Sequence, residues 1–144
     1  MPMVRLIYAS RFSRGVGPND MPDILAVSRE KNAAAGVTGI LCYDPRYFLQ
    51  VLEGPRKVVN ALYNQIANDE RHADVTLIEY AEIDERLFAN WAMAFVRVDD
   101  LGNPFMLKHS SNGVFDPFAM SGEQALDFVC TVRDLRAQDF DETA

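Results

Sequence analysis

Residues 37 to 53 read VTGILCYDPRYFLQVLE, two apolar runs on either side of a short turn. Apolar runs rich in β-branched and aromatic residues, separated by turn residues, are typical of a β-hairpin. We therefore expect strands at Val37–Tyr43 and Tyr47–Glu53. After Gly54 and Pro55 the period becomes helical, which predicts an amphipathic helix. Its apolar stripe is Val58, Val59, Leu62, Tyr63 and Ile66.

Three further strands flank this hairpin and helix. Polar and apolar residues alternate over Val4–Ser10, and strands are also expected at Val75–Ile83 and Trp91–Val98. The last strand would place Trp91, Met93 and Phe95 on one face. A short helical turn is expected between these two strands, around Asp84–Ala89.

A helix is predicted between the first strand and the hairpin. Residues 11–22 are rich in Gly, Ser and Pro and form a loop, and the helix spans Pro22–Ala35. Asn19 or Asp20 caps its start, and Gly36 follows its end. The resulting order, with right-handed crossovers, predicts a ferredoxin-like α+β sandwich: a five-stranded mixed sheet with two helices on one face.

The character of the chain changes beyond Asp100. Leu101–Pro117 is irregular with one short helix, and Ser121–Gln138 is an amphipathic helix that begins with a Ser121–Gln124 capping box. Its stripe is Ala125, Phe128, Val129, Val132 and Leu135. We expect one domain over residues 1–99. Residues 100–144 would be a helical extension that covers the open face of the sheet or forms an oligomer or partner interface.

The charge and composition of the chain argue against nucleic acids and membranes as partners. The 144 residues carry a formal net charge of -7, which disfavours nucleic-acid binding across a broad face. The chain lacks a good signal peptide and any apolar stretch of the ~20 residues that a membrane span needs. Cys42 and Cys130 lie far apart and read as buried free thiols. We expect a cytoplasmic protein with no membrane partner.

Polar residues occupy positions where an apolar core is expected. Gln50 lies mid-strand, and Tyr8 brings a hydroxyl into the first strand. Ser28 and Asn32 interrupt the stripe that begins at Ile24. Each has an ordinary structural explanation, but a buried amide without partners costs roughly 1–3 kcal/mol. If Tyr8 and Gln50 bond one another and Asn32 faces them, the three line a small polar pocket, as in many ligand sites.

Common catalytic signatures are absent. The sequence contains no GxGxxG after the first strand, no P-loop, no HExxH and no GxSxG. Its two histidines, His72 and His109, lack the spacing of a metal pair. We therefore expect neither a metal site nor an enzyme.

At these positions the sequence resembles the BLUF family of blue-light sensors that use FAD. The matching stretches are LIYAS at 6–10, Asn32 followed by GVTGIL at 36–41, FLQVLEG at 48–54 and FANWAM at 88–93. They occur in the family's order and spacing over residues 1 to about 99.

The resemblance implies a role for each unusual residue. Tyr8 would donate an electron and a proton to the excited flavin, and Gln50 would bridge Tyr8 and the N5 and C4-carbonyl edge. Asn32 would hold the C4 carbonyl and N3, and Lys31 the C2 carbonyl. Ile24 and Ile66 would lie on the two ring faces, and Ser28 would support the Gln50 amide. Asp69 and His72 would contact the ribityl chain or phosphates, although acidic and basic residues are also common at a helix end without any ligand.

Trp91 and Met93 match a pair of which either one lies near Gln50, and ordinary strand packing remains an alternative for both. The implied cofactor is FAD, with FMN and riboflavin as alternatives. The implied partner is a downstream signalling protein, and we expect a homo-oligomer.

Two other classes of function stay open. The first is a light-independent ferredoxin-like regulator that binds a small ligand or a protein. The second is a flavin-dependent redox enzyme, which is disfavoured because Ile24 and Ile66 would cover both ring faces.

Overall fold

The computed structural model describes residues 2–13, 15, 30–110 and 112–143, with the side chains of residues 103 and 137–143 left aside. Five strands form one sheet in the order β4-β1-β3-β2-β5. Neighbouring strands are antiparallel except β2 and β5, which are parallel. The strands are β1 (Met3–Phe12), β2 (Thr38–Tyr43), β3 (Tyr47–Pro55), β4 (His72–Ile83) and β5 (Ala94–Arg97).

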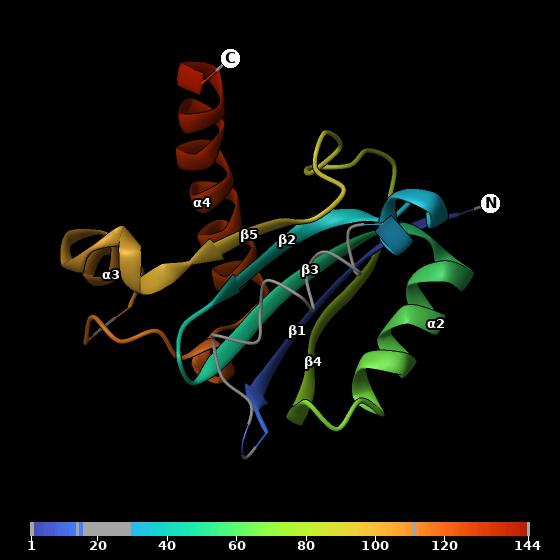
Figure 1. The fold of residues 1–144 in the computed structure, drawn as a ribbon, viewed down its shortest axis with the longest axis horizontal. Helices are drawn as coiled ribbons and strands as arrows, with labels where there is room; N and C mark the ends of the chain where they lie inside the picture. The colour runs from blue at the N-terminus through green and yellow to red at the C-terminus, as the bar shows by residue number, and fades with distance from the viewer. Residues whose placement is uncertain (1, 14, 16–29, 111, 144) are drawn as a thin grey trace.

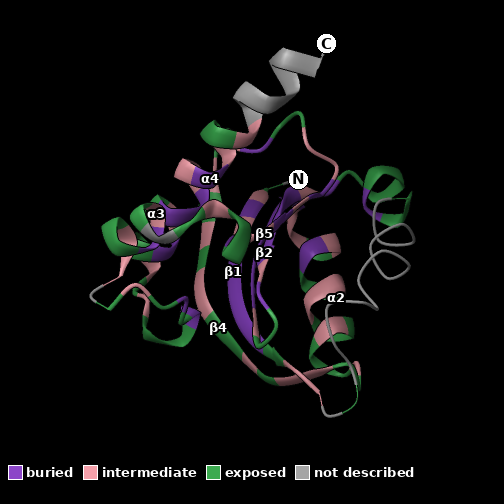
Figure 2. Ribbon diagram, turned by 60° about the vertical axis from the view of Figure 1, so that its left-hand side comes forward, coloured by how far each residue is buried: buried purple, intermediate pink, exposed green. Residues whose placement is uncertain are grey.

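Helices cover both faces of this sheet (Figure 1). Figure 2 shows α2 (Arg56–Ala67) and the helical residues 30–35 on one side, and α3 (Asn103–His109) and α4 (Gly122–Thr143) on the other. Two short 3₁₀ turns complete this region: η2 (Val98–Leu101) precedes α3, and η3 (Pro117–Ala119) lies between α3 and α4. The predicted ferredoxin-like sandwich with a C-terminal helix is confirmed.

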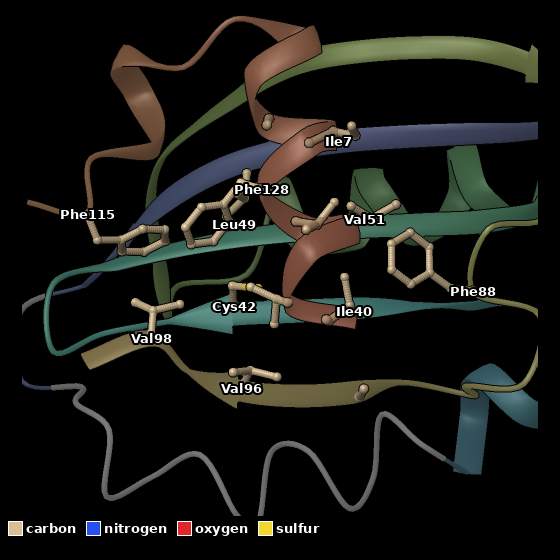
Figure 3. Packing of buried hydrophobic residues seen from close by; sticks show 14 of the residues in the cluster. Ile7, Ile40, Cys42, Leu49, Val51, Phe88, Val96, Val98, Phe115 and Phe128 are labelled. Carbon is tan, nitrogen blue, oxygen red and sulfur yellow. The ribbon is translucent and has the colours of Figure 1, made fainter. Parts of the chain in front are cut away.

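Strand alternation divides the buried residues into two clusters. On β3, Phe48 and Leu52 pack toward α2, whereas Leu49 and Val51 pack toward α4. Figure 3 shows Leu49 and Val51 beneath α4, with Phe128 of that helix close to Leu49. Because successive side chains on a strand point to opposite faces, β3 contributes to both cores at once.

The helix ends follow the local sequence signals. Gly36, after the helical residues 30–35, has φ +77°, a conformation that glycine adopts without steric cost. The start of that helix, including Asn19, Asp20 and Pro22, lies outside the described residues. At α4 the capping box is confirmed: Ser121 N donates to Gln124 Oε1 at 2.9 Å and Gln124 N to Ser121 Oγ at 3.1 Å.

Two predictions for the segment before β5 are wrong. Residues 84–89 form no helical turn, because the Leu87 and Phe88 N–H groups donate to the Glu53 carboxylate instead of to helical carbonyls. The fifth strand starts at Ala94 rather than Trp91. Trp91 N donates to Phe88 O in a turn, so strand alternation does not extend back to Trp91.

The apolar stripe of α4 packs inward. Ala125, Phe128, Val129 and Val132 are at most 1% exposed and belong to the cluster between α4 and the sheet, although Leu135 is exposed. The stripe therefore covers the second face of the sheet and is not free to bind a partner. The boundary near residue 100 between a domain and its extension stays a prediction.

Two further findings concern membranes and thiols. No helix in the described part of the chain is long and apolar enough to span a bilayer. Cys42 is a buried free thiol as predicted, but Cys130 is only half-buried because it lies at the margin of the α4 contact.

Removing the Phe128 side chain tests how much the α4 contact stabilises the fold. Phe128→Ala should lower the free energy of unfolding by about 3–5 kcal/mol, because it leaves a cavity in a close-packed core. Leu135→Ala on the exposed side of the helix should cost about 1 kcal/mol or less. Urea unfolding followed by circular dichroism measures both, and equal losses would contradict the packing described above.

Candidate functional site

A buried tyrosine–glutamine pair lies on the face of the sheet that α2 covers. The antiparallel register places Tyr8 of β1 directly opposite Gln50 of β3. The Tyr8 hydroxyl donates to Gln50 Oε1, and the two residues are 1% and 7% exposed. This contact satisfies the hydroxyl and the amide oxygen, which would otherwise be costly to bury. The expected bond between Tyr8 and Gln50 is confirmed.

Met93 lies at the other end of the Gln50 amide. Gln50 Nε2 donates to Met93 Sδ at 3.4 Å, and Met93 is buried. Trp91 packs toward the opposite cluster, with its ring 6.2 Å from that of Phe88. The prediction that Trp91 and Met93 share a face is therefore wrong. Met93 is the member of the pair that lies beside Gln50.

Close backbone packing next to Met93 leaves no room for a side chain at Gly39. A Cβ atom at Gly39 would lie 1.9 Å from the Val51 carbonyl oxygen and 3.4 Å from Met93 Cε. Gly39 thereby brings β2 tightly against β3 beside the Gln50 site.

The Tyr8 phenol is held in its neutral form. Burial raises the pKa of Tyr8 well above its ordinary value of 10.0, and the neighbouring Tyr63 and Asp69 raise it further. The ring of Tyr63 on α2 lies 5.8 Å from that of Tyr8. Tyr8 thus keeps its proton throughout the neutral range and can donate it along the bond to Gln50.

An open pocket lies between the end of the first helix and α2. It has a volume of about 330 Å³, within the range of small-molecule sites. Asn32 is 4% exposed and supplies an amide, while Lys31 and Lys57 add positive charge at the rim. The remaining lining residues are Ala35, Val37, Val58, Ala61, Leu62 and Gln65.

This lining suits a planar aromatic ring with a polar edge. Val37, Val58 and Leu62 belong to the same apolar cluster as Tyr8, and half-buried Ile66 packs against that cluster too. The amide of Asn32 and the ammonium of Lys31 offer hydrogen-bond donors for ring carbonyls. The residues present therefore fit an isoalloxazine ring.

The end of α2 leads to a second polar group. Asp69 accepts hydrogen bonds from the Arg71 guanidinium, which lower the pKa of Asp69 to about 2. His72 lies at the start of β4, where its Nδ1 is 2.8 Å from Ser10 Oγ and its ring packs 4.8 Å from that of Phe48. His72 thus lies against Tyr8 and Phe48 rather than in solvent.

The site differs in part from the sequence-based expectation. Ile24 and Ser28 lie outside the described residues. The structure adds Tyr63 and Ser10, which the sequence placed in a helix stripe and a strand, and Arg71, to which the sequence gave no role. For Arg71 the sequence did offer one signal, because it lies two residues after the acidic Asp69 and can pair with it. No sequence signal indicated Tyr63 or Ser10. No cluster of three or more metal-ligating side chains occurs in the described part of the chain.

Residues 3–94 match the family model for BLUF, described as sensors of blue light using FAD. Among curated proteins, the photoactivated adenylate cyclase subunit alpha of Euglena gracilis is 34% identical over 88 residues, 61% of this chain. The blue light- and temperature-regulated antirepressor BluF of Escherichia coli (strain K12) is 31% identical over 81 residues, 55% of this chain.

The length of the match differs among these relatives. The chain spans 9% of the cyclase subunit and 20% of the antirepressor. By contrast, the solved structure of BlsA in its photo-activated state matches over 88% of this chain and 91% of that one. Its TM-score is 0.79 and its sequence identity 32%.

The burial of His72 predicts a loss of stability in mild acid. Burial lowers the pKa of His72 below its ordinary value of 6.5, so the unfolded chain binds the proton more tightly. The free energy of unfolding should therefore fall as the pH drops below about 6.5, and His72→Gln should flatten this fall. Urea titrations of wild type and His72→Gln between about pH 7 and 5.5 measure it. Equal slopes in wild type and His72→Gln would contradict this role of burial.

Proposed function

The chain belongs to the BLUF family, the sensors of blue light that use FAD, and we propose that Tyr8 and Gln50 are its photochemical pair. One observation carries this proposal: the buried hydrogen bond from the Tyr8 hydroxyl to Gln50 Oε1, on the same face as the pocket. Both residues match the family's signalling tyrosine and glutamine.

The flavin ring would occupy the pocket between residues 30–37 and α2. There Asn32 and Lys31 would hold the ring carbonyls, and Ile66 would pack on one ring face. Ile24 and Ser28 keep their expected roles as ring contact and support of Gln50. When bound, the flavin supplies the light-absorbing group and the acceptor for an electron.

The remaining chemistry belongs to the protein. After Tyr8 gives up an electron, its hydroxyl proton moves readily along the existing bond to Gln50 Oε1. The Gln50 amide has an acceptor at one end and a donor at the other, so its rotation or tautomerisation reverses the polarity of the network. Met93 Sδ is a weak acceptor and cannot donate to an amide oxygen in return. Rotation of the amide therefore breaks its hydrogen bond to Met93.

The polar group after α2 would hold the remainder of the cofactor. Arg71 carries a positive charge beside Asp69 and His72, which makes these three residues the candidates for contacts to the ribityl chain and the phosphates. This assignment favours FAD over riboflavin, because riboflavin has no phosphate for Arg71 to bind.

We propose that the chain senses light and passes a signal to a downstream protein, without turning over a substrate itself. The matched relatives carry this kind of domain beside a cyclase or in an antirepressor. A homo-oligomer stays our prediction for the assembly, and a cytoplasmic location stays our prediction for its compartment.

The absorption spectrum of the purified protein with FAD, before and directly after blue light, tests this function. A flavin spectrum that shifts slightly to the red and relaxes in the dark is expected, because the hydrogen bonding to the ring changes while the ring survives. Protein that takes up no flavin, or flavin that only bleaches, would contradict the proposal.

Substitution of the tyrosine isolates its role. Tyr8→Phe removes the hydroxyl but keeps the ring, so flavin should still bind while the red shift is lost. Tyr63→Phe, on the ring 5.8 Å away, is the matched control and should keep the shift. A red shift that survives in Tyr8→Phe would exclude Tyr8 as the photochemical donor.

A further inference from the structure

Glu53 is a buried carboxylate on the same strand as Gln50. It lies three residues further along β3 and faces the opposite side of the sheet, where it is 0% exposed. Arg5 Nε donates to Glu53 Oε2 at 2.8 Å, Leu87 N donates to Oε2 at 3.1 Å, and Phe88 N donates to Oε1 at 2.8 Å. A buried charge is retained only where such donors offset its desolvation.

These contacts determine the course of the irregular segment 84–93. Two of its N–H groups bond to Glu53 rather than to a neighbouring strand or helical carbonyl. Next to them the Arg86 guanidinium donates to Thr38 Oγ1 at 2.9 Å and to Gly36 O at 2.7 Å. Residues 86–88 are therefore held against β2 and β3 by side chains, not by a strand ladder.

The segment leads directly to the residue beside Gln50. Phe88 O accepts from Trp91 N at 3.1 Å, and Trp91 O accepts from Gly39 N at 3.0 Å. Two residues later, Met93 Sδ accepts the hydrogen bond from Gln50 Nε2. The position of Met93 relative to Gln50 is thus fixed at one end by Glu53 and at the other by β5.

The same segment also contacts α4. Arg133 Nη1 donates to the Leu87 carbonyl at 3.0 Å, and its guanidinium lies 5.8 Å from the centroid of the Phe88 ring. Figure 3 shows the Phe88 ring beside Val51, in the buried layer that also contains Phe128 of α4. Leu87 therefore joins the two sides, since its N–H bonds to Glu53 of β3 and its carbonyl to Arg133 of α4.

We propose that Glu53 and Arg133 are positioning residues that couple the Gln50–Met93 contact to α4. This inference rests on the proposed photochemical role of Tyr8 and Gln50. Glu53 holds the N–H groups of Leu87 and Phe88 so that the Leu87 carbonyl reaches Arg133. A shift at Met93 is carried back through Trp91 and Phe88, which are hydrogen-bonded to one another, and strains this Leu87–Arg133 contact and with it the packing of α4.

Hydrogen–deuterium exchange of the full chain with FAD, in the dark and under blue light, tests this coupling. Glu53→Gln keeps the size of the side chain but replaces one acceptor oxygen with a donor, which then faces N–H groups. In the dark it should raise exchange at Leu87 and Phe88 about tenfold, because their acceptor is weakened. Glu85→Gln removes an exposed carboxylate of the same segment and should behave like wild type.

The light response separates coupling from simple stabilisation. Wild type should show light-dependent exchange at residues 86–97 and 122–136. Glu53→Gln and Arg133→Gln should keep the flavin red shift but reduce the light–dark difference in α4 at least about threefold. Arg133 is 27% exposed, so Arg133→Gln provides the test even where Glu53→Gln does not fold.

Two results would overturn the proposal, and they differ from one another. A full α4 response in Arg133→Gln, or in folded Glu53→Gln, would refute the coupling while leaving the photoreceptor function intact. Absence of a red shift in wild type would refute the photochemical role of Tyr8 and Gln50, and the coupling with it. Emission from Trp91, the single tryptophan, reports the same segment independently.

Discussion

The register between β1 and β3 is the constraint from which both polar sites follow. Pairing Tyr8 with Gln50 also pairs Arg5 with Glu53, so one alignment of two strands creates the tyrosine–glutamine bond and the buried ion pair. A slip of one residue would move every side chain of β3 to the other face. The Gln50 amide and the Glu53 carboxylate would then be buried among apolar residues without their hydrogen-bond partners. The apolar residues on both faces make such a slip costly, and thereby hold the two sites in place.

Gln50 and Glu53 place polar chemistry on opposite faces of a single central strand. Gln50 faces the α2 side and the pocket, whereas Glu53 faces the α4 side and the segment before β5. Met93 is the point where the two meet, because it follows the segment that Glu53 holds and accepts from the Gln50 amide. A local change on the pocket face thus has a short covalent and hydrogen-bonded route to the far face.

Much of this arrangement could be predicted because it depends on local periodicity. The hairpin, the stripe on α2 and the capping box of α4 follow from residue spacing, and the Tyr8–Gln50 contact follows from strand neighbours. The irregular segment 84–93 could not be predicted in the same way. Its conformation depends on Glu53, more than thirty residues earlier, and no local pattern shows that a strand glutamate takes the N–H groups of Leu87 and Phe88. The same bonds explain why Trp91 and Met93 lie on different faces.

The burial of the α4 stripe changes how a signal can leave the molecule. Phe128 and Val132 are enclosed against the sheet, so exposing them to a partner would require α4 to detach and lose its core contacts. A smaller change is sufficient if α4 shifts while it stays packed. Arg133 lies at the edge of the buried stripe, where the helix meets the segment before β5, and its guanidinium is partly exposed. Signal output through the outer surface of a still-docked α4 is therefore less costly than release of the helix.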